Sequence, residues 1–341
     1  MAIKAAGAFK RLDSEDITIS AESIVAPLWS TDQSVLTQFF TSSGQVASNT
    51  GNYFYEVYQS DPEIETETSY VQVDLAYGHK LGSGSAPYNT GVVGKSPTST
   101  IYGQYRTLIY GDEDTNFVFG TYESEGIYVI NAERARYKEK LFPGSLNLTL
   151  TVGANTLELT DNSRDVTTVA FVDGGRVYDI VSGSDGLPYS GTGFTPSLGS
   201  YGKFLPDIGV IVLNADALDA TTGAGGIVLG TTLTESPNNI GRLYDAVALG
   251  ASTSLKSEET ISSNYIFVRV RNGEYNYSTN PSNITSSGEL RWDVMINSPQ
   301  AYITTVGMYN DTNDLLAVAK LSRPLLKDFT KEALVRIKLD Y

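Results

Sequence analysis

The chain contains no cysteine and only one histidine, His79. The lack of cysteine excludes disulfide bridges and thiolate metal sites. A single histidine excludes most histidine-based metal centres and catalytic triads, and the surrounding sequence YGHKLGSGS does not have the Gly-x-Ser-x-Gly pattern of a nucleophile elbow. The sequence therefore predicts a protein without catalytic residues, without a cofactor and without a metal site.

Three partial motifs do not change this prediction. Gly94-Lys95-Ser96 lacks the earlier glycine of a phosphate-binding loop, and Gly223 to Gly226 lacks the third glycine of a dinucleotide loop. Asp112 begins an acidic run with calcium-loop spacing, but Phe117 stands where that loop needs glycine. These segments are therefore interpreted as ordinary loops and turns.

Long apolar runs are also missing. The longest, Ile208 to Leu213, is far shorter than a membrane span, and the first residues, MAIKAAGAFKRLDSEDI, have no apolar signal-peptide core. We expect no membrane partner, and we expect the chain to stay in the cytoplasm.

Positive charge is scarce in most of the chain. The formal net charge is −15, and since residues 251–341 carry equal numbers of acidic and basic residues, the first 250 residues carry the whole excess. Such a surface repels a phosphate backbone, so nucleic acid is not an expected partner.

The residues that are abundant favour strands and turns. The chain has 32 glycines and 22 tyrosines with only 18% charged residues, a profile typical of many short strands joined by turns. The fold class is predicted to be mainly β, with antiparallel sheets that are sandwich-like and a few short helices. At 341 residues, two or three compact units are expected.

The predicted organisation has three regions, namely a mixed α+β acidic region (1–144), a central antiparallel β region with a long Gly-rich loop at 183–200 (145–250) and a β-sandwich-like docking domain (251–341). Helices are predicted over 33–40 and 97–110, where polar caps precede apolar residues at helical spacing. A third helix is predicted over 238–249 from the helical spacing of its apolar residues. Hairpins are predicted over 146–159, over 166–181 and at Asn272-Gly273, and a last strand is predicted at 333–339.

Two segments are candidate interfaces. The mixed run Arg134-Ala135-Arg136-Tyr137-Lys138-Glu139-Lys140 interrupts an acidic region, and Arg and Tyr are favoured in buried interface patches. A solvated strand or helix end explains the run equally well. Residues 301–321 form a hairpin whose five-residue polar turn includes Asn310, Asp311 and Asp314. An exposed turn of this kind is free to present side chains to a partner.

This hairpin carries a resemblance. The string I-x-x-V-G-M-Y, a polar turn and L-L-A-V-A resembles the segment of phage tail-fibre domains that seats on a baseplate, with Thr305 where the family usually has Glu. Together with IYGQYRTLIYGDED (101–114), NAERARYKEKLFPGSLNLTL (131–150), YGKFLPDIGVIVLN (201–214) and NYIFVRVRNGEYNYSTNP (264–281), it is similar to virion structural proteins of cyanobacterial contractile-tailed phages.

The resemblance implies a non-enzymatic structural protein of the virion tail, placed in the baseplate or its fibre-attachment region. Its expected partners are other tail and baseplate proteins and tail fibres, and it is expected to be an oligomer in the particle. Two alternatives stay open: a structural protein of the neck or capsid exterior, and a carbohydrate-binding or carbohydrate-cleaving surface module.

Overall fold

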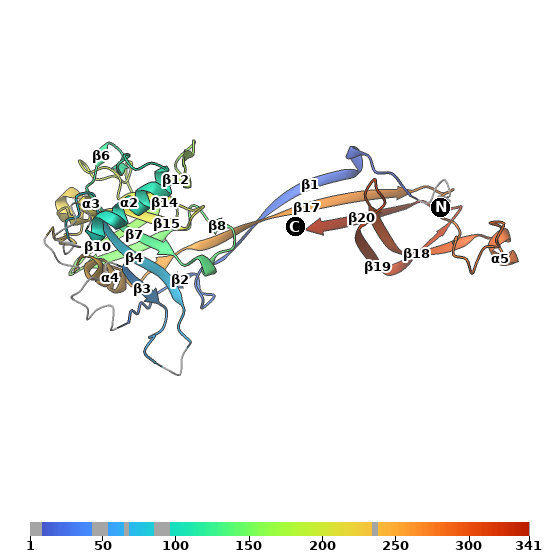
Figure 1. Cartoon of the computed structure of the whole chain (residues 1–341), viewed down its shortest axis with the longest axis horizontal. Helices are drawn as coiled ribbons and strands as arrows, with labels where there is room; N and C mark the ends of the chain where they lie inside the picture. Colours follow the sequence, from blue (N-terminus) through green and yellow to red (C-terminus); the bar gives the residue numbers. More distant parts are fainter. Residues whose placement is uncertain (1–8, 43–53, 65–67, 85–95, 234–237, 341) are drawn as a thin grey trace. The chain divides into compact units, whose positions relative to one another are not determined.

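The computed structural model describes residues 9–42, 54–64, 68–84, 96–233 and 238–340. Strands make up 43% of the chain and helices 15%, so the prediction of a mainly β protein with a few short helices is confirmed. The chain divides into two compact units, one of residues 24–259 and one of residues 1–23 with 260–341. The element order is shown in Figure 1.

This division differs from the three predicted regions. The expected boundary at residue 144 falls inside one sheet of the larger unit, where strand β7 (Gly126–Ala132) pairs with β15 (Val210–Asn214). The N-terminal arm joins the C-terminal unit instead of the acidic region. Strand pairing between residues far apart in sequence sets both boundaries, and composition does not reveal such pairing.

The larger unit is built on one twelve-stranded sheet, and the strand pairs within the described residues are antiparallel. Ten strands lie in the order β2-β16-β9-β10-β12-β14-β15-β7-β4-β3, while β11 and β13 pair with β12. Besides β7 and β15, the strands are β2 (Val35–Leu36), β3 (Phe54–Tyr58), β4 (Val71–His79), β9 (Asn147–Val152), β10 (Asn155–Asp161), β11 (Ala170–Val172), β12 (Gly175–Ser184), β13 (Leu187–Pro188), β14 (Gly202–Leu205) and β16 (Thr253–Ser254).

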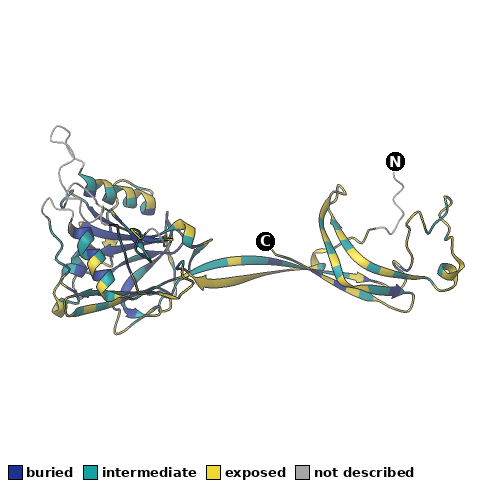
Figure 2. Ribbon diagram, turned by 90° about the horizontal axis from the view of Figure 1, so that it is seen from below, coloured by how far each residue is buried: buried dark blue, intermediate teal, exposed yellow. Residues whose placement is uncertain are grey.

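Helices cover this sheet, and the unit has two hydrophobic clusters. The larger cluster contains the buried face of α4 (Asn238–Gly250), and the smaller contains that of α2 (Pro97–Tyr110). The strands between the helices are mostly buried in Figure 2. The remaining elements are short, namely α3 (Ala215–Asp219), the 3₁₀ helices η2 (Arg134–Arg136) and η3 (Thr222–Ala224), β5 (Val118–Phe119), β6 (Tyr122–Glu123) and β8 (Lys140–Leu141).

The helices predicted over 97–110 and 238–249 are confirmed. In α2, Ser96 is the N-cap and Pro97 the first helical residue, and Gly111 ends the helix with a φ of 66°. In α4, Ile240, Leu243 and Val247 are buried, as their helical spacing predicts. Local signals were sufficient in both cases, namely capping with periodicity for α2 and periodicity for α4.

The helix predicted over 33–40 is wrong. Val35 and Leu36 form strand β2, which pairs with Thr253 and Ser254 of β16. The polar residues that suggested an N-cap precede a strand, and Leu36 is buried in the core of the larger unit. Pairing with a strand more than 200 residues away overrides the weak local helical pattern.

The hairpins predicted over 146–159 and 166–181 are confirmed as β9–β10 and β11–β12. The Gly-rich segment 183–200 is more regular than expected. Strand β12 continues to Ser184, turns at Asp185-Gly186 and pairs back through β13, with Gly183 opposite Pro188. Gly186 has a φ of 81°, a conformation that glycine adopts without strain.

The smaller unit has two layers that pack face to face. One layer contains strands β1 (Ile17–Pro27), β17 (Lys256–Val270) and β20 (Ala333–Asp340) in the order β1-β17-β20. The other is the hairpin of β18 (Gln300–Tyr309) and β19 (Leu315–Asp328). Their shared core contains Ile266, Val335, Ile337, Val306, Met308, Ala319 and Leu321. The predicted last strand and the predicted hairpin over 301–321 are both confirmed.

The hairpin predicted at Asn272-Gly273 is wrong, because strand β17 does not turn back there. Its partner is β20, with Ile266 opposite Ile337 and Val268 opposite Val335. Residues 271–299, here called the excursion, instead form turns and the short helix α5 (Asp293–Asn297). The other short element of this unit is the 3₁₀ helix η1 (Ser14–Asp16), in the N-terminal arm.

Candidate functional site

The histidine is a structural residue of the larger unit. His79 is 3% exposed, and its Nδ1 accepts hydrogen bonds from the backbone N–H groups of Leu81 and Ser83 at 3.1 and 3.3 Å. Burial lowers the pKa of the His79 imidazole, which favours its neutral form. Because Nδ1 is occupied by two backbone donors, His79 shapes the turn that follows β4 and is poorly placed to act as a base.

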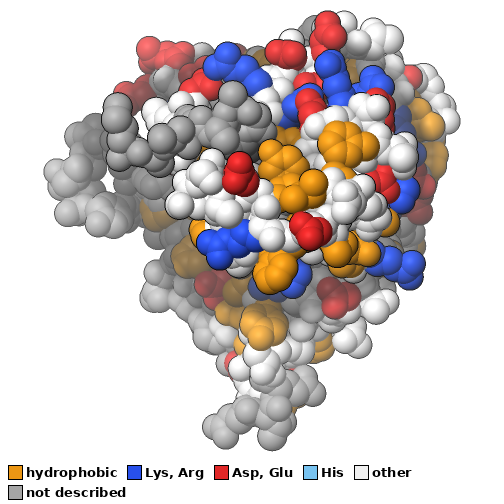
Figure 3. Space-filling model, turned by 90° about the vertical axis from the view of Figure 1, so that its right-hand side faces the viewer, with side chains coloured by type: hydrophobic (Ala, Val, Ile, Leu, Met, Phe, Trp, Pro, Cys, Tyr) orange, Lys and Arg blue, Asp and Glu red, His pale blue; other side chains and the backbone are white. Residues whose placement is uncertain are grey.

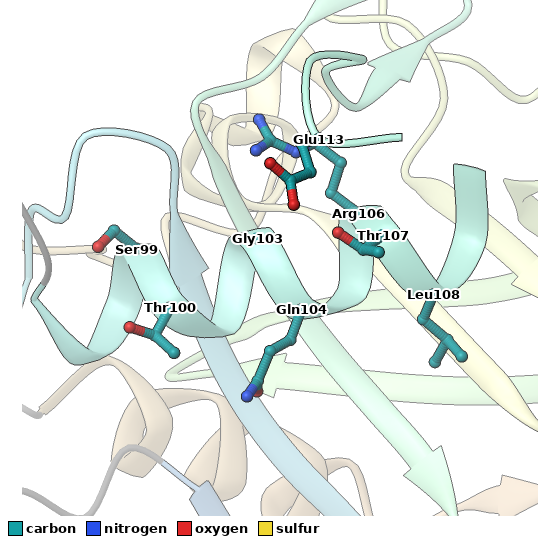
Figure 4. A pocket seen from close by; sticks show the side chains of 8 residues that line it. All are labelled: Ser99, Thr100, Gly103, Gln104, Arg106, Thr107, Leu108 and Glu113. Carbon is teal, nitrogen blue, oxygen red and sulfur yellow. The ribbon is translucent and has the colours of Figure 1, made fainter. Parts of the chain in front are cut away.

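A hollow runs along the outer side of α2 (Figure 4). It is lined by Ser99, Thr100, Gly103, Gln104, Arg106, Thr107, Leu108 and Glu113. All but Glu113 belong to the one helix, so the hollow is an open surface depression and not an enclosed binding cavity. Its hydroxyl and amide groups do not include a nucleophile paired with a base.

The predicted interface residue Tyr137 lies in the core of the larger unit. It is 6% exposed, and burial raises the pKa of its phenol. Its ring packs against Gly209, where an added Cβ would come within 2.5 Å of the Tyr137 hydroxyl. Tyr137 therefore exposes little of its ring at the surface of the unit, and its place in an interface stays a prediction. A tyrosine next to charged residues is ambiguous in sequence, because core and interface both favour it.

The two arginines of this segment lie in the 3₁₀ helix η2. The Arg134 guanidinium stacks 4.6 Å from the centre of the Tyr137 ring and donates hydrogen bonds to the carbonyls of Tyr137 and Lys138. Arg136 lies 5.3 Å from the centre of the Tyr70 ring. Both cations thus have partners within the unit, and the role of this run as an interface stays a prediction.

The polar turn of the β18–β19 hairpin is held together by its own side chains. The Asn310 Oδ1 accepts from the backbone N–H of Asp314 at 2.7 Å, and the Thr312 hydroxyl donates to the Asp314 carboxylate at 2.6 Å. Hydrogen bonds from Thr312 and Asn310 lower the pKa of the Asp314 carboxyl. Asn310 and Asp314 therefore build the turn, whereas the Asp311 side chain is 99% exposed.

The outer face of the hairpin is apolar. Tyr309, Leu315, Leu316 and Val318 are exposed, by 46, 53, 66 and 59%. The Tyr309 ring lies over Gly307, whose added Cβ would be 3.0 Å from it. Since Val306 and Met308 fill the inner face, the hairpin is apolar on both sides. We call Tyr309, Leu315, Leu316 and Val318 the hairpin patch.

The residue pattern indicated the hairpin but not that Leu316 and Val318 are exposed. A register shift between Met308 and Tyr309 leaves both Leu315 and Leu316 exposed. The adjacent leucines were a usable signal, since successive strand residues point to opposite faces and a regular strand cannot bury both in one core.

The excursion adds further exposed apolar side chains. Trp292, Val294 and Ile296 are 57, 78 and 57% exposed in and beside α5. The excursion is anchored by Lys327, which is fully buried and donates from Nζ to Asn272 O at 2.9 Å, to Asn276 Oδ1 at 2.6 Å and to Asp328 O at 2.9 Å. In Figure 3, hydrophobic side chains gather in the middle of one face, with charged side chains around them.

A patch of this kind is the usual signature of a protein interface. Single exposed apolar residues are ordinary, but several on one strand pair, with Tyr and Leu next to charged neighbours, resemble the apolar core and polar rim of a binding surface. We therefore take the hairpin patch as the candidate functional site.

No protein-family model, curated protein or solved structure matches the chain. Within the described residues, no helix is long and apolar enough to cross a membrane. In the same part of the chain, no group of three His, Cys, Asp or Glu side chains is placed to hold a metal ion.

Proposed function

We propose that the chain is a non-enzymatic structural protein of a contractile phage tail, in the baseplate or its fibre-attachment region, and that the hairpin patch docks it onto another tail protein. The observation that carries the proposal is the hairpin itself. The segment that resembles the baseplate-seating part of tail fibres forms a two-stranded hairpin, and its outer face exposes Leu315, Leu316 and Val318.

The chemistry of the patch indicates the kind of partner. Aliphatic side chains around a tyrosine fit an apolar protein surface, and their removal from water would stabilise the complex. The turn residues Asn310 and Asp314 contribute shape, because their side chains are used within the turn. Of the turn residues in the predicted interface, Asp311 is the one with a fully exposed side chain.

The double variant Leu316→Lys with Val318→Lys tests the proposal. Both side chains are more than half exposed, so the isolated variant should melt like the parent protein. Phages that carry the variant gene should contain far less of the protein per particle, measured by quantitative mass spectrometry of purified particles. Phe171→Lys is the matched control, because Phe171 is a 71% exposed apolar residue of the larger unit.

Normal amounts of the double variant in particles would exclude the hairpin patch as the docking surface. Purified tails without heads separate the tail from the neck and capsid alternatives, because a tail protein stays with such tails. A glycan array with a hydrolysis assay separates docking from the carbohydrate alternative, in which sugars bind to exposed rings such as Trp292 and Tyr302.

A further inference from the structure

Strand β1 is an open edge of the smaller unit. It lies at one end of the order β1-β17-β20, and each of its eleven residues is exposed. An edge strand has a row of backbone N–H and C=O groups that can pair with a strand of another chain. The segment Ile17 to Ser23 is the part of β1 that belongs to the smaller unit.

This segment has few of the features that keep edge strands single. Natural edges are protected by short length, lysines, prolines or bulges. Ile17 to Ser23 has one charged residue, Glu22, and Ile19 is 69% exposed beside the 38% exposed Ile17. Among the described residues, the hydrophobic cluster of this unit takes no member from β1. The exposed isoleucines therefore have no core of their own.

The opposite end of the same sheet has complementary charge. Strand β20 is the other terminal strand, and its exposed side chains include Arg336 and Lys338. Residues 13–23 contain four acidic residues and no basic residue in the sequence. Lys338 forms an ion pair with Asp340 of the same strand at 2.9 Å, and the Asp340 carboxylate also accepts from the Ser263 hydroxyl at 2.6 Å, so Arg336 carries the net positive charge of this edge.

We infer that a second copy of this chain pairs its β1 segment Ile17 to Ser23 with strand β20 of the first copy. The contact joins two different surfaces, an acidic edge and a basic edge, so each copy keeps one edge free for a further copy until a ring closes. A second copy fits both edges because the sheet carries both. The inference does not depend on the function of the hairpin patch.

Sedimentation of the full chain tests the inference. Its average mass should rise above that of a monomer between about 1 and 100 µM, the range of moderate specific association. Ile19→Lys should weaken association about tenfold or more, because it places a cation against the basic edge. Phe171→Lys, on the larger unit, should leave association unchanged. A chain that stays monomeric throughout, or an Ile19→Lys variant that associates like the parent, overturns the inference.

A charge exchange identifies the two edges. Glu22→Lys opposes the basic edge, and Arg336→Glu opposes the acidic one, so each variant alone should associate poorly. Mixed together, they should form a complex, because Lys at position 22 of one copy then meets Glu at position 336 of the other. Failure of the mixture to associate overturns the pairing of β1 with β20.

The hairpin variant Leu316→Lys with Val318→Lys separates this inference from the proposed function. It should associate with itself like the parent chain and still be excluded from particles. If it loses self-association while Ile19→Lys keeps it, the copies meet through the hairpin patch and the strand pairing is wrong.

Discussion

Replacing the buried Lys327 by methionine should destabilise the smaller unit and release the excursion. Lys327 is fully buried, and its ammonium donates to Asn272 O, Asn276 Oδ1 and Asp328 O. These acceptors are neutral oxygens, so the charge is stabilised by hydrogen bonds alone. Methionine keeps the length of the apolar stem and removes the three donors together.

The expected loss follows from those three hydrogen bonds. A buried acceptor that loses its donor costs about 1–3 kcal/mol. Asn272 O also accepts from the Asn276 amide at 2.7 Å, so it keeps one donor. The variant also avoids the cost of holding a charge out of water, which returns part of the loss. We expect the free energy of unfolding to fall by about 2–3 kcal/mol.

Urea unfolding measures the stability, and amide hydrogen exchange over residues 271–277 measures release of the excursion. Lys320→Met is the matched control, because Lys320 is an exposed lysine on the same strand, and its effect should be within about 0.5 kcal/mol. If Lys327→Met matches this control in both measurements, the ammonium does not hold the excursion.

Three further predictions concern other sites. Burial, with repulsion from Glu133 and Glu56, raises the pKa of the Asp74 carboxyl to about 6. The folded state therefore binds the proton more tightly than the unfolded state, and the protein loses stability as the pH rises from about 4 to 6. In urea titrations, Asp74→Asn should raise the free energy of unfolding by about 1–2 kcal/mol at pH 8, after discounting for the partial exposure of Asp74, and by almost nothing near pH 4. In the same assay, Asn310→Ala should lower the free energy of unfolding by about 1 kcal/mol, because the turn loses the side-chain oxygen that accepts from the Asp314 N–H. Asp311→Ala should leave the stability unchanged, and equal effects of the two variants would contradict the turn geometry. Ile337→Asp should unfold the smaller unit, at a cost of several kcal/mol, because it buries an unpaired charge beside Ile266, and a soluble variant that melts cooperatively at the parent temperature would refute this.

Elements with strong local signals could be predicted from the sequence. Helix α2 has Ser96 and Pro97 at its start and Gly111 at its end, and the β18–β19 hairpin has a polar turn between two apolar runs. Such signals depend on neighbouring residues only, so distant parts of the chain do not change them.

Elements that depend on distant partners could not be predicted. Val35 lies in a strand because β16 pairs with it. Asn272 does not begin a hairpin, because the strand that pairs with β17 is β20 and not the residues that follow Gly273. The same holds for the candidate site. The sequence indicated the hairpin but not the exposure of Leu316 and Val318, because the register shift that exposes Leu316 depends on how the two strands align.

The order of the two units along the chain also determines which of them can fold first during synthesis. Residues 24–259 form a continuous unit, while the other unit needs residues 1–23 together with 260–341. A ribosome therefore completes the larger unit while the N-terminal arm still waits for its partners. Once it has folded, the Ser257 hydroxyl lies 3.4 Å from the carbonyl of Ala26, so the two ends of the insertion are side by side. Folding of the larger unit has then already paid the entropy of closing that long loop. The last strands to emerge can therefore pair with the arm at the entropic cost of a short loop.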